Sequence, residues 1–142
     1  MSFLGGTRKP LLLGLAMAAL FGLGSCGADH PKLDALEADP MASVTFAHTD
    51  LAEEIETPEG TTLGKPVHAA ITRRFTFSGV EPQKLVDAAG ALAVHHGWAA
   101  GTTRPRAFEA SKTVGGVTAD LLITVAPFEG EPALFVYITA RN

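Results

Sequence analysis

The sequence contains little cysteine, little positive charge and no long apolar run. Its 142 residues include one cysteine, which excludes a disulfide framework and any zinc site that needs two or more thiolates. Eleven Lys and Arg residues against 15 Asp and Glu residues give a net charge of −4, so the chain lacks the basic surface of a general nucleic-acid binder. A chain of this length has room for the hydrophobic core of one domain.

The main apolar stretch, Leu11–Leu23, has 13 residues. A membrane-spanning helix needs about 20 residues, so this stretch is too short to cross a bilayer. Arg8 and Lys9 precede it, and no acidic residue does. A basic start followed by a short apolar run and small residues is typical of a secretory signal peptide, which we predict over residues 1–25.

The apolar stretch ends in the tetrapeptide Leu23-Gly24-Ser25-Cys26, which resembles the lipobox of bacterial lipoproteins. The resemblance implies that a signal peptidase cuts before Cys26, which becomes a diacylglyceryl cysteine that carries acyl chains such as palmitate. Two acyl chains hold a protein stably on a membrane, whereas a single chain gives marginal attachment. The expected location is therefore the outer face of the cytoplasmic membrane. A plain signal peptide with a chance cysteine, or a buried apolar helix with a free thiol, is the alternative.

Later segments resemble small uncharacterised lipoproteins of actinobacteria. The resemblance rests on these segments: Asp39–Ala42, Thr57–Thr61, Leu63–Ala69, Arg73–Phe75 and Gly97-Trp98. It implies lipid anchoring but brings no activity, because that group has no assigned biochemical role to carry over.

The segment after the signal peptide is rich in proline and contains nine of the 15 acidic residues. A stretch with few apolar residues and charge of one sign cannot bury enough surface to offset the entropy lost on ordering. We therefore predict a lipid-anchored flexible tether over residues 26–40 and an irregular acidic segment over residues 41–66. Within the acidic segment, Ser43–Phe46 is a candidate edge strand, and Asp50–Ile55 is either a helical turn or extended chain.

Clear periodic patterns begin after residue 66. Residues 69–77 alternate apolar and polar side chains, which predicts a strand. Pro82–His96 carries apolar residues at three- and four-residue spacing, which predicts an amphipathic helix. Three further strands are predicted: Phe108–Thr113, Val117–Val125 and Ala133–Ala140. This order predicts an α+β domain over residues 67–142, with one helix on one face of a four-stranded antiparallel sheet.

Two candidate binding residues each have two interpretations. Trp98 follows the predicted helix, where it either covers the end of the core, with its indole N–H on a carbonyl or a water, or stacks on a sugar or a peptide. Arg73 and Arg74 are adjacent on the first predicted strand, so one of them shares a face with Phe75. That arginine is either a rim residue whose stem packs on the sheet or, as we consider for Arg73, an anion-binding residue.

Phe135 and Tyr137 are the other two candidate binding residues. Alternation on the last predicted strand places both side chains on the face away from the helix, together with Leu122. We favour a cover formed by Met41–Glu56 packing over this face. The alternative is an exposed patch that marks a contact site.

We find no catalytic constellation and no metal site in the sequence. Adjacent helical residues point about 100° apart, so His95 and His96 cannot bind one metal ion together. The chain has no Gly-x-Ser-x-Gly elbow and no Ser-x-x-Lys motif. We therefore expect no enzyme activity and no cofactor, but a lipid-anchored module that binds an envelope protein or a small ligand. A structural or accessory lipoprotein without its own ligand is the alternative, followed by a secreted enzyme.

Overall fold

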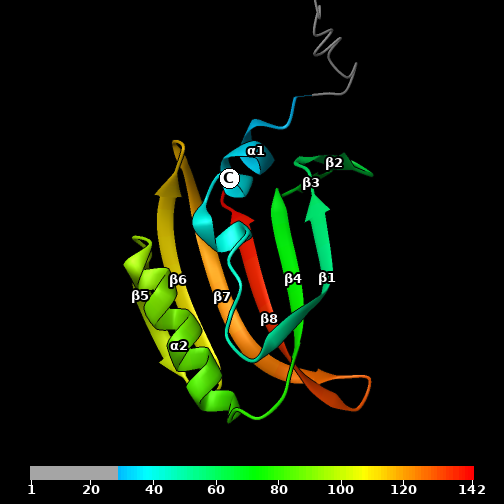
Figure 1. Ribbon diagram of the computed structural model, residues 1–142. Helices are drawn as coiled ribbons and strands as arrows, with labels where there is room; N and C mark the ends of the chain where they lie inside the picture. Colours follow the sequence, from blue (N-terminus) through cyan, green and yellow to red (C-terminus); the bar gives the residue numbers. More distant parts are fainter. Residues whose placement is uncertain (1–28) are drawn as a thin grey trace, which may run out of the picture.

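A six-stranded antiparallel sheet forms the centre of the structure (Figure 1). The computed structural model describes residues 29–142. The strand order is β1-β4-β8-β7-β6-β5, so the last strand of the chain lies between β4 and β7. The strands are β1 (Thr49–Thr57), β4 (Ala70–Phe77), β5 (Ala99–Arg104), β6 (Ala107–Val114), β7 (Val117–Phe128) and β8 (Glu131–Ala140). A separate hairpin of β2 (Gly60–Thr62) and β3 (Lys65–Val67) connects β1 to β4.

The helices lie together on one face of this sheet (Figure 1). They are α1 (Pro31–Glu37), the 3-10 helix η1 (Pro40–Ala42) and α2 (Pro82–His95). α2 lies across β5, β6 and β7, and α1 packs on β4, β7 and β8. The predicted α+β class with an antiparallel sheet is confirmed, but the sheet has six strands where four were predicted, and there are two α-helices where one was predicted.

The predicted helix over Pro82–His96 matches α2 to within one residue. Pro82 occupies its first turn, where a missing N–H costs no hydrogen bond. The apolar stripe, which includes Leu85 and Val86, is buried against the sheet. Gly90 lets the helix approach β6 closely, because a Cβ at this position would lie 2.8 Å from a ring carbon of Phe108.

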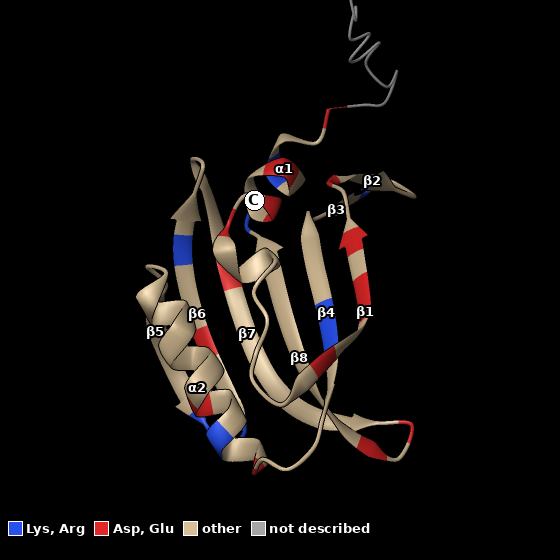
Figure 2. Cartoon of the chain, viewed as in Figure 1, with Lys and Arg blue, Asp and Glu red and all other residues tan. Residues whose placement is uncertain are grey.

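Within the six-stranded sheet, the two strands that the sequence patterns did not predict, β1 and β5, are the two edges. All six residues of β5 are exposed and most are small, so the segment has no alternating apolar pattern. β1 is mostly exposed and carries four acidic residues, which Figure 2 shows along that edge. Charged side chains on an edge strand discourage pairing with another chain. The same charges made β1 resemble an irregular segment in the sequence.

The predicted tether and irregular segment are wrong for most of their described residues. α1 and η1 fall within residues 31–42 and pack on the sheet, with Leu36 and Met41 fully buried. Ser43–Phe46 is not a strand, and Asp50–Ile55 belongs to β1. A few apolar side chains therefore suffice to dock this acidic stretch, because the sheet already offers them an apolar surface.

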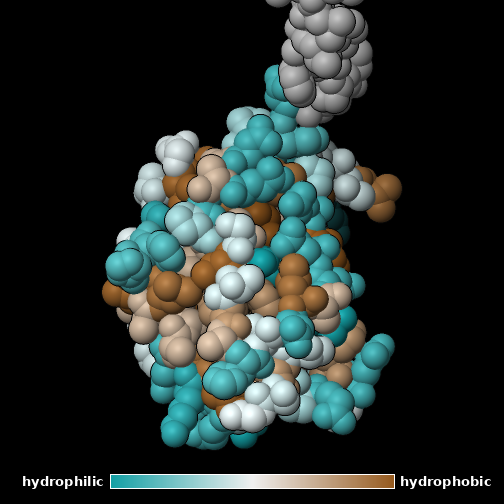
Figure 3. All heavy atoms as spheres, in the orientation of Figure 1, coloured by the Kyte–Doolittle hydropathy of each residue, from teal (hydrophilic) through white to brown (hydrophobic). Residues whose placement is uncertain are grey.

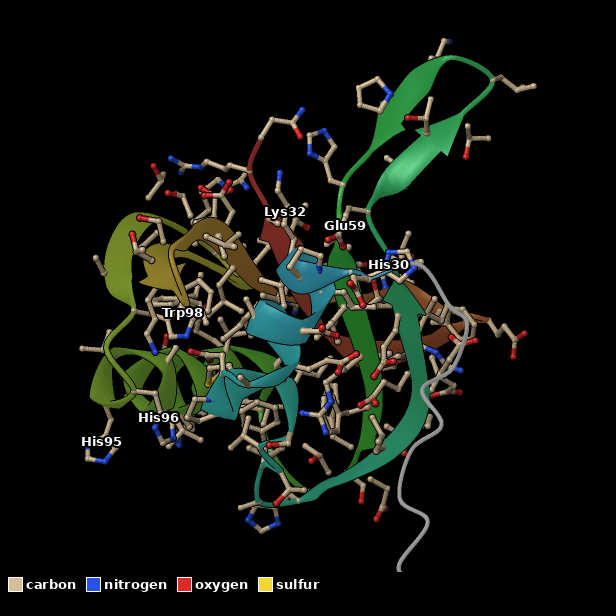
Figure 4. The ribbon with its side chains drawn as sticks, turned by 90° about the horizontal axis from the view of Figure 1, so that it is seen from above. His30, Lys32, Glu59, His95, His96 and Trp98 are labelled. Carbon is tan, nitrogen blue, oxygen red and sulfur yellow. The ribbon has the colours of Figure 1, made fainter. Side chains whose placement is uncertain are left out.

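Glu59, in the turn between β1 and β2, caps α1 from a distant part of the chain (Figure 4). Its carboxylate oxygens accept hydrogen bonds from the backbone N–H groups of Lys32 at 2.8 Å and Leu33 at 3.2 Å. Desolvation raises the pKa of Glu59, but these hydrogen bonds and the nearby charge of His30 outweigh it and hold the pKa below its ordinary value. The carboxylate thus ties the start of the described chain to the end of β1.

Candidate functional site

The sheet face opposite the helices, here called the outer face, is the candidate site. Leu134, Val136 and Ile138 of β8 are completely buried beneath the helices, whereas Phe135 and Tyr137 point to the outer face and are partly exposed. The predicted orientation of these side chains is therefore correct. The favoured cover, Met41–Glu56, is wrong: its first part packs on the helix-bearing face, and its second part is edge strand β1.

A column of aromatic rings runs along the outer face. Phe135 and Tyr137 stack in parallel, with ring centroids 5.7 Å apart and planes inclined by 3°. Phe128 and Phe135 are arranged edge to face, with centroids 6.3 Å apart. The guanidinium of Arg74 lies 3.8 Å from the centre of the Phe128 ring. Tyr137 therefore ends the column, and one face of its ring is free of aromatic neighbours among the described residues.

A hollow of about 570 Å³ lies beside Tyr137, over β8, β7, β6 and β5. This outer-face hollow is lined by Gly101, Thr102, Glu109, Ala110, Ser111, Asp120, Leu121, Leu122, Tyr137, Thr139 and Arg141. Its volume falls in the range of about 300–1,000 Å³ that is usual for small-molecule sites. The hollow has a mixed lining of one aromatic ring, aliphatic side chains, hydroxyl groups and charged groups.

Cross-strand register explains why these residues meet. Tyr137 is paired with Leu122, and Leu122 is paired with Glu109. In the next row, Thr139, Asp120 and Ser111 are paired across β8, β7 and β6. A register irregularity between Ala100 and Thr103 of β5 places the small residues Gly101 and Thr102 at the far side. The small residues on β6 and β5 lie beside the longer Tyr137 and Leu122 of the first row, and the hollow lies over them.

Each charged side chain that lines the hollow has a partner of opposite charge. Arg141 holds Asp120 with two hydrogen bonds, one of 2.7 Å from Nε, and the hydrogen bonds and charge of Asp120 raise the pKa of the guanidinium. Arg104 donates a hydrogen bond of 2.6 Å to Glu109. Burial raises the pKa of the Tyr137 hydroxyl. The hollow is therefore close to neutral and rich in both donors and acceptors.

Arg73, a predicted anion-binding candidate, lies on the inner face and is buried. Its Nε donates to Glu54 at 2.9 Å, its Nη1 donates to the carbonyl of Val44 at 2.6 Å, and its guanidinium lies over Phe75. With its charge matched and its donors directed into the protein, Arg73 does not face an external anion. Its buried position holds the 43–48 segment against the sheet.

Trp98, a predicted stacking candidate, is also buried, with 2% of its surface exposed. Its indole N–H donates to Asp39 at 3.0 Å, and Asp39 also accepts from the Met41 backbone at 2.9 Å and from Lys112 at 2.6 Å. Lys112 in turn donates to the carbonyl of His96 at 2.7 Å. Figure 4 shows Trp98 pointing inward, whereas His95 points away from the end of α2. Trp98 therefore closes the end of the core, and the sequence reading missed its partner Asp39.

The histidines remain apart from the hollow. His95 and His96 project from the end of α2, far from His30 at the other side of Figure 4. Within residues 29–142, no group of three or more His, Cys, Asp or Glu side chains is arranged to hold a metal ion. None of the helices in that range has the length and apolar character needed to span a membrane.

The helix-bearing face offers a smaller apolar groove of about 280 Å³ between α2 and the 45–48 segment. Figure 3 views this face and shows apolar atoms exposed among polar ones. Its apolar lining includes side chains that also belong to the core or pack against it, such as Phe46, Leu85 and Leu92. It is smaller and less polar than the outer-face hollow, so it offers fewer groups for selecting a ligand.

Four predicted site residues, Leu23, Gly24, Ser25 and Cys26, lie outside the described residues. The chain matches no protein-family model, no curated protein and no solved structure.

Proposed function

We propose that this protein is a lipid-anchored module of the cell envelope that binds a ligand or partner through the outer face of its sheet. The observation that carries the proposal is the outer-face hollow, which the described residues leave open. The face of an antiparallel sheet that meets water normally carries polar side chains. Here the exposed face carries a column of aromatic rings and a hollow of ligand size instead.

The lipobox-like sequence supports the anchoring part of the proposal. Cys26 is the only cysteine, and α1 begins at Pro31. The four intervening residues span at most about 14 Å when extended. A lipid on Cys26 would therefore keep the folded part near the bilayer surface and direct its binding to envelope components.

The anchoring part is tested by intact mass and detergent phase partitioning of protein from the native host, wild type beside Cys26→Ala. We expect a mature mass that begins at Cys26 and includes acyl chains, with partitioning into the detergent phase. Both should be lost in the variant. An unlipidated product cut at another position would overturn this part of the proposal.

The binding part is tested by thiol labelling, since an acylated Cys26 leaves no free thiol. Single cysteines are introduced by Ser111→Cys in the hollow and by Ala91→Cys on the exposed side of α2. We expect a maleimide to label Cys at position 111 more slowly on intact cells than in purified protein, while labelling at position 91 is unchanged. Equal labelling rates on cells and in purified protein at both positions would contradict an occupied outer face. That result is the one expected for a structural lipoprotein without a ligand.

A further inference from the structure

We infer that the outer-face hollow binds a neutral saccharide, with one sugar ring stacked on Tyr137. This inference rests on the proposed function and adds the chemical class of the ligand. The first observation is the orientation of the tyrosine ring. Phe135 stacks against Tyr137 at 5.7 Å and does not line the hollow, whereas Tyr137 and Thr139 do, so the hollow lies on the side of Tyr137 away from Phe135.

A free aromatic face recognises a ring that presents C–H groups. The C–H-bearing face of a sugar ring is apolar, and the rim of the same ring carries hydroxyl groups. Leu122, paired with Tyr137 across β7 and β8, extends the apolar surface at the base of the hollow. The ring and the leucine together form an apolar corner of the kind that can receive one face of a sugar.

Polar groups surround this apolar corner. Ser111 and Thr139 supply hydroxyls that donate and accept, and they flank the Asp120 carboxylate in the cross-strand register. Asp120 accepts hydrogen bonds and Arg141 donates them, so their ion pair can hold two neighbouring hydroxyls at once. A ligand with many hydroxyl groups matches this alternation of donors and acceptors.

The balance of charge decides between ligand classes. Among the described residues that line the hollow, the charged side chains are Glu109, Asp120 and Arg141, and each is paired. An anionic ligand would have to weaken an arginine–carboxylate pair by competing for the guanidinium charge, and a cationic ligand would have to weaken one by competing for the carboxylate. A neutral ligand needs neither change.

The hollow also reaches the edge of the sheet. Gly101 and Thr102 belong to β5, which within residues 29–142 has a neighbouring strand on one side only. An occupant can therefore continue past the sheet edge, so an internal unit of a longer glycan fits as well as a terminal unit.

The test uses the full chain, purified with its anchor in a zwitterionic detergent that contains no sugar. Tyr137 is the only tyrosine, so protein labelled with ¹³C-tyrosine gives the ring signals of this one residue. The probes are linear trisaccharides of glucose, mannose and N-acetylglucosamine, with a galacturonate trisaccharide and trialanine for comparison. We expect at least one neutral trisaccharide to shift the Tyr137 signals saturably, while the anionic sugar and the peptide do not. Stronger binding of the anionic sugar or of the peptide, or no response to any neutral sugar, would overturn the inference.

Matched variants locate the contact, with saturation transfer observed on the sugar protons. Tyr137→Ala should weaken binding about tenfold, because stacking and buried ring area are both lost. Tyr137→Phe keeps the ring and should retain most of the affinity. Val94→Ala removes an exposed apolar side chain of α2, on the opposite face of the sheet, and should change affinity by no more than about twofold. Equal sugar affinities for wild type, Tyr137→Ala and Tyr137→Phe, with both variants folded, would exclude Tyr137 as the stacking residue.

The two proposals fail in distinguishable ways. Slow labelling of Ser111→Cys on cells without any response to neutral sugars leaves the binding module in place and refutes the saccharide. Unhindered labelling on cells together with no response to sugars refutes both.

Discussion

The two faces of the sheet are built from the same strands but treat polar groups in opposite ways. On the inner face, Arg73 and Asp39 are buried and each holds several protein groups in fixed geometry. On the outer face, Asp120 and Glu109 are partly exposed and each is paired with an arginine near the surface. The inner polar groups therefore determine how the segments pack, while the outer ones remain accessible for contact.

The sharpest test of this comparison uses two adjacent residues of β8. Leu134→Ala removes a completely buried side chain and should lower the free energy of unfolding by about 3 kcal/mol. Phe135→Ala removes a larger side chain from the outer face and should cost about 1 kcal/mol, because that side chain is already partly in water. Urea denaturation followed by Trp98 fluorescence measures both. Equal losses would show that the outer face is part of the core.

The next test compares two aspartates. Asp39→Asn removes a buried charge that faces Lys112 and should cost about 2 kcal/mol, since the lysine amino group is left without its partner. Asp120→Asn loses an exposed ion pair with Arg141 and should change stability by no more than about 0.5 kcal/mol. The same denaturation measurement applies. If Asp120→Asn were the more damaging change, its ion pair would have a structural role.

The smallest expected effect is a pH dependence at Tyr137. Burial raises the pKa of its hydroxyl in the folded state above the unfolded value of about 10. Below pH 10 the hydroxyl is protonated in both states, so its contribution to stability is fully present. As the pH rises above 10, the unfolded chain releases the proton first, and the contribution is lost until the pH passes the folded pKa. Wild type should therefore lose more stability than Tyr137→Phe above pH 10, and parallel curves would contradict this assignment.

The sequence predicted the elements whose pattern reflects burial on one side. β4, β6, β7, β8 and α2 each carry apolar residues at the period of their own structure, and each was predicted. β1 and β5 have little burial and so no period to detect. α1 has seven residues with two buried leucines, which is too short for a helical pattern to stand out in an acidic stretch.

The sequence predicted which face of the sheet carries the candidate site, but not which residues form the hollow. Alternation sufficed to place Tyr137 and Phe135 on the face away from the helix. The hollow depends on register across four strands, which brings Ser111, Asp120 and Thr139 into one row. Spacing along the chain does not specify that register. Likewise, no local signal connects Asp39 with Lys112, 73 residues later in the chain.

The docking of α1 also determines how the molecule responds to mechanical load. Among the described residues, a force applied from the N-terminal side reaches α1 first, and α1 is held by two buried leucines and the Glu59 carboxylate. Its seven residues measure about 10 Å as a helix and about 24 Å when extended, so peeling it lengthens the chain by about 14 Å. The next obstacle is the buried Asp39 with its three hydrogen bonds. Under load, α1 would therefore detach and extend while the strands of the sheet stay hydrogen-bonded.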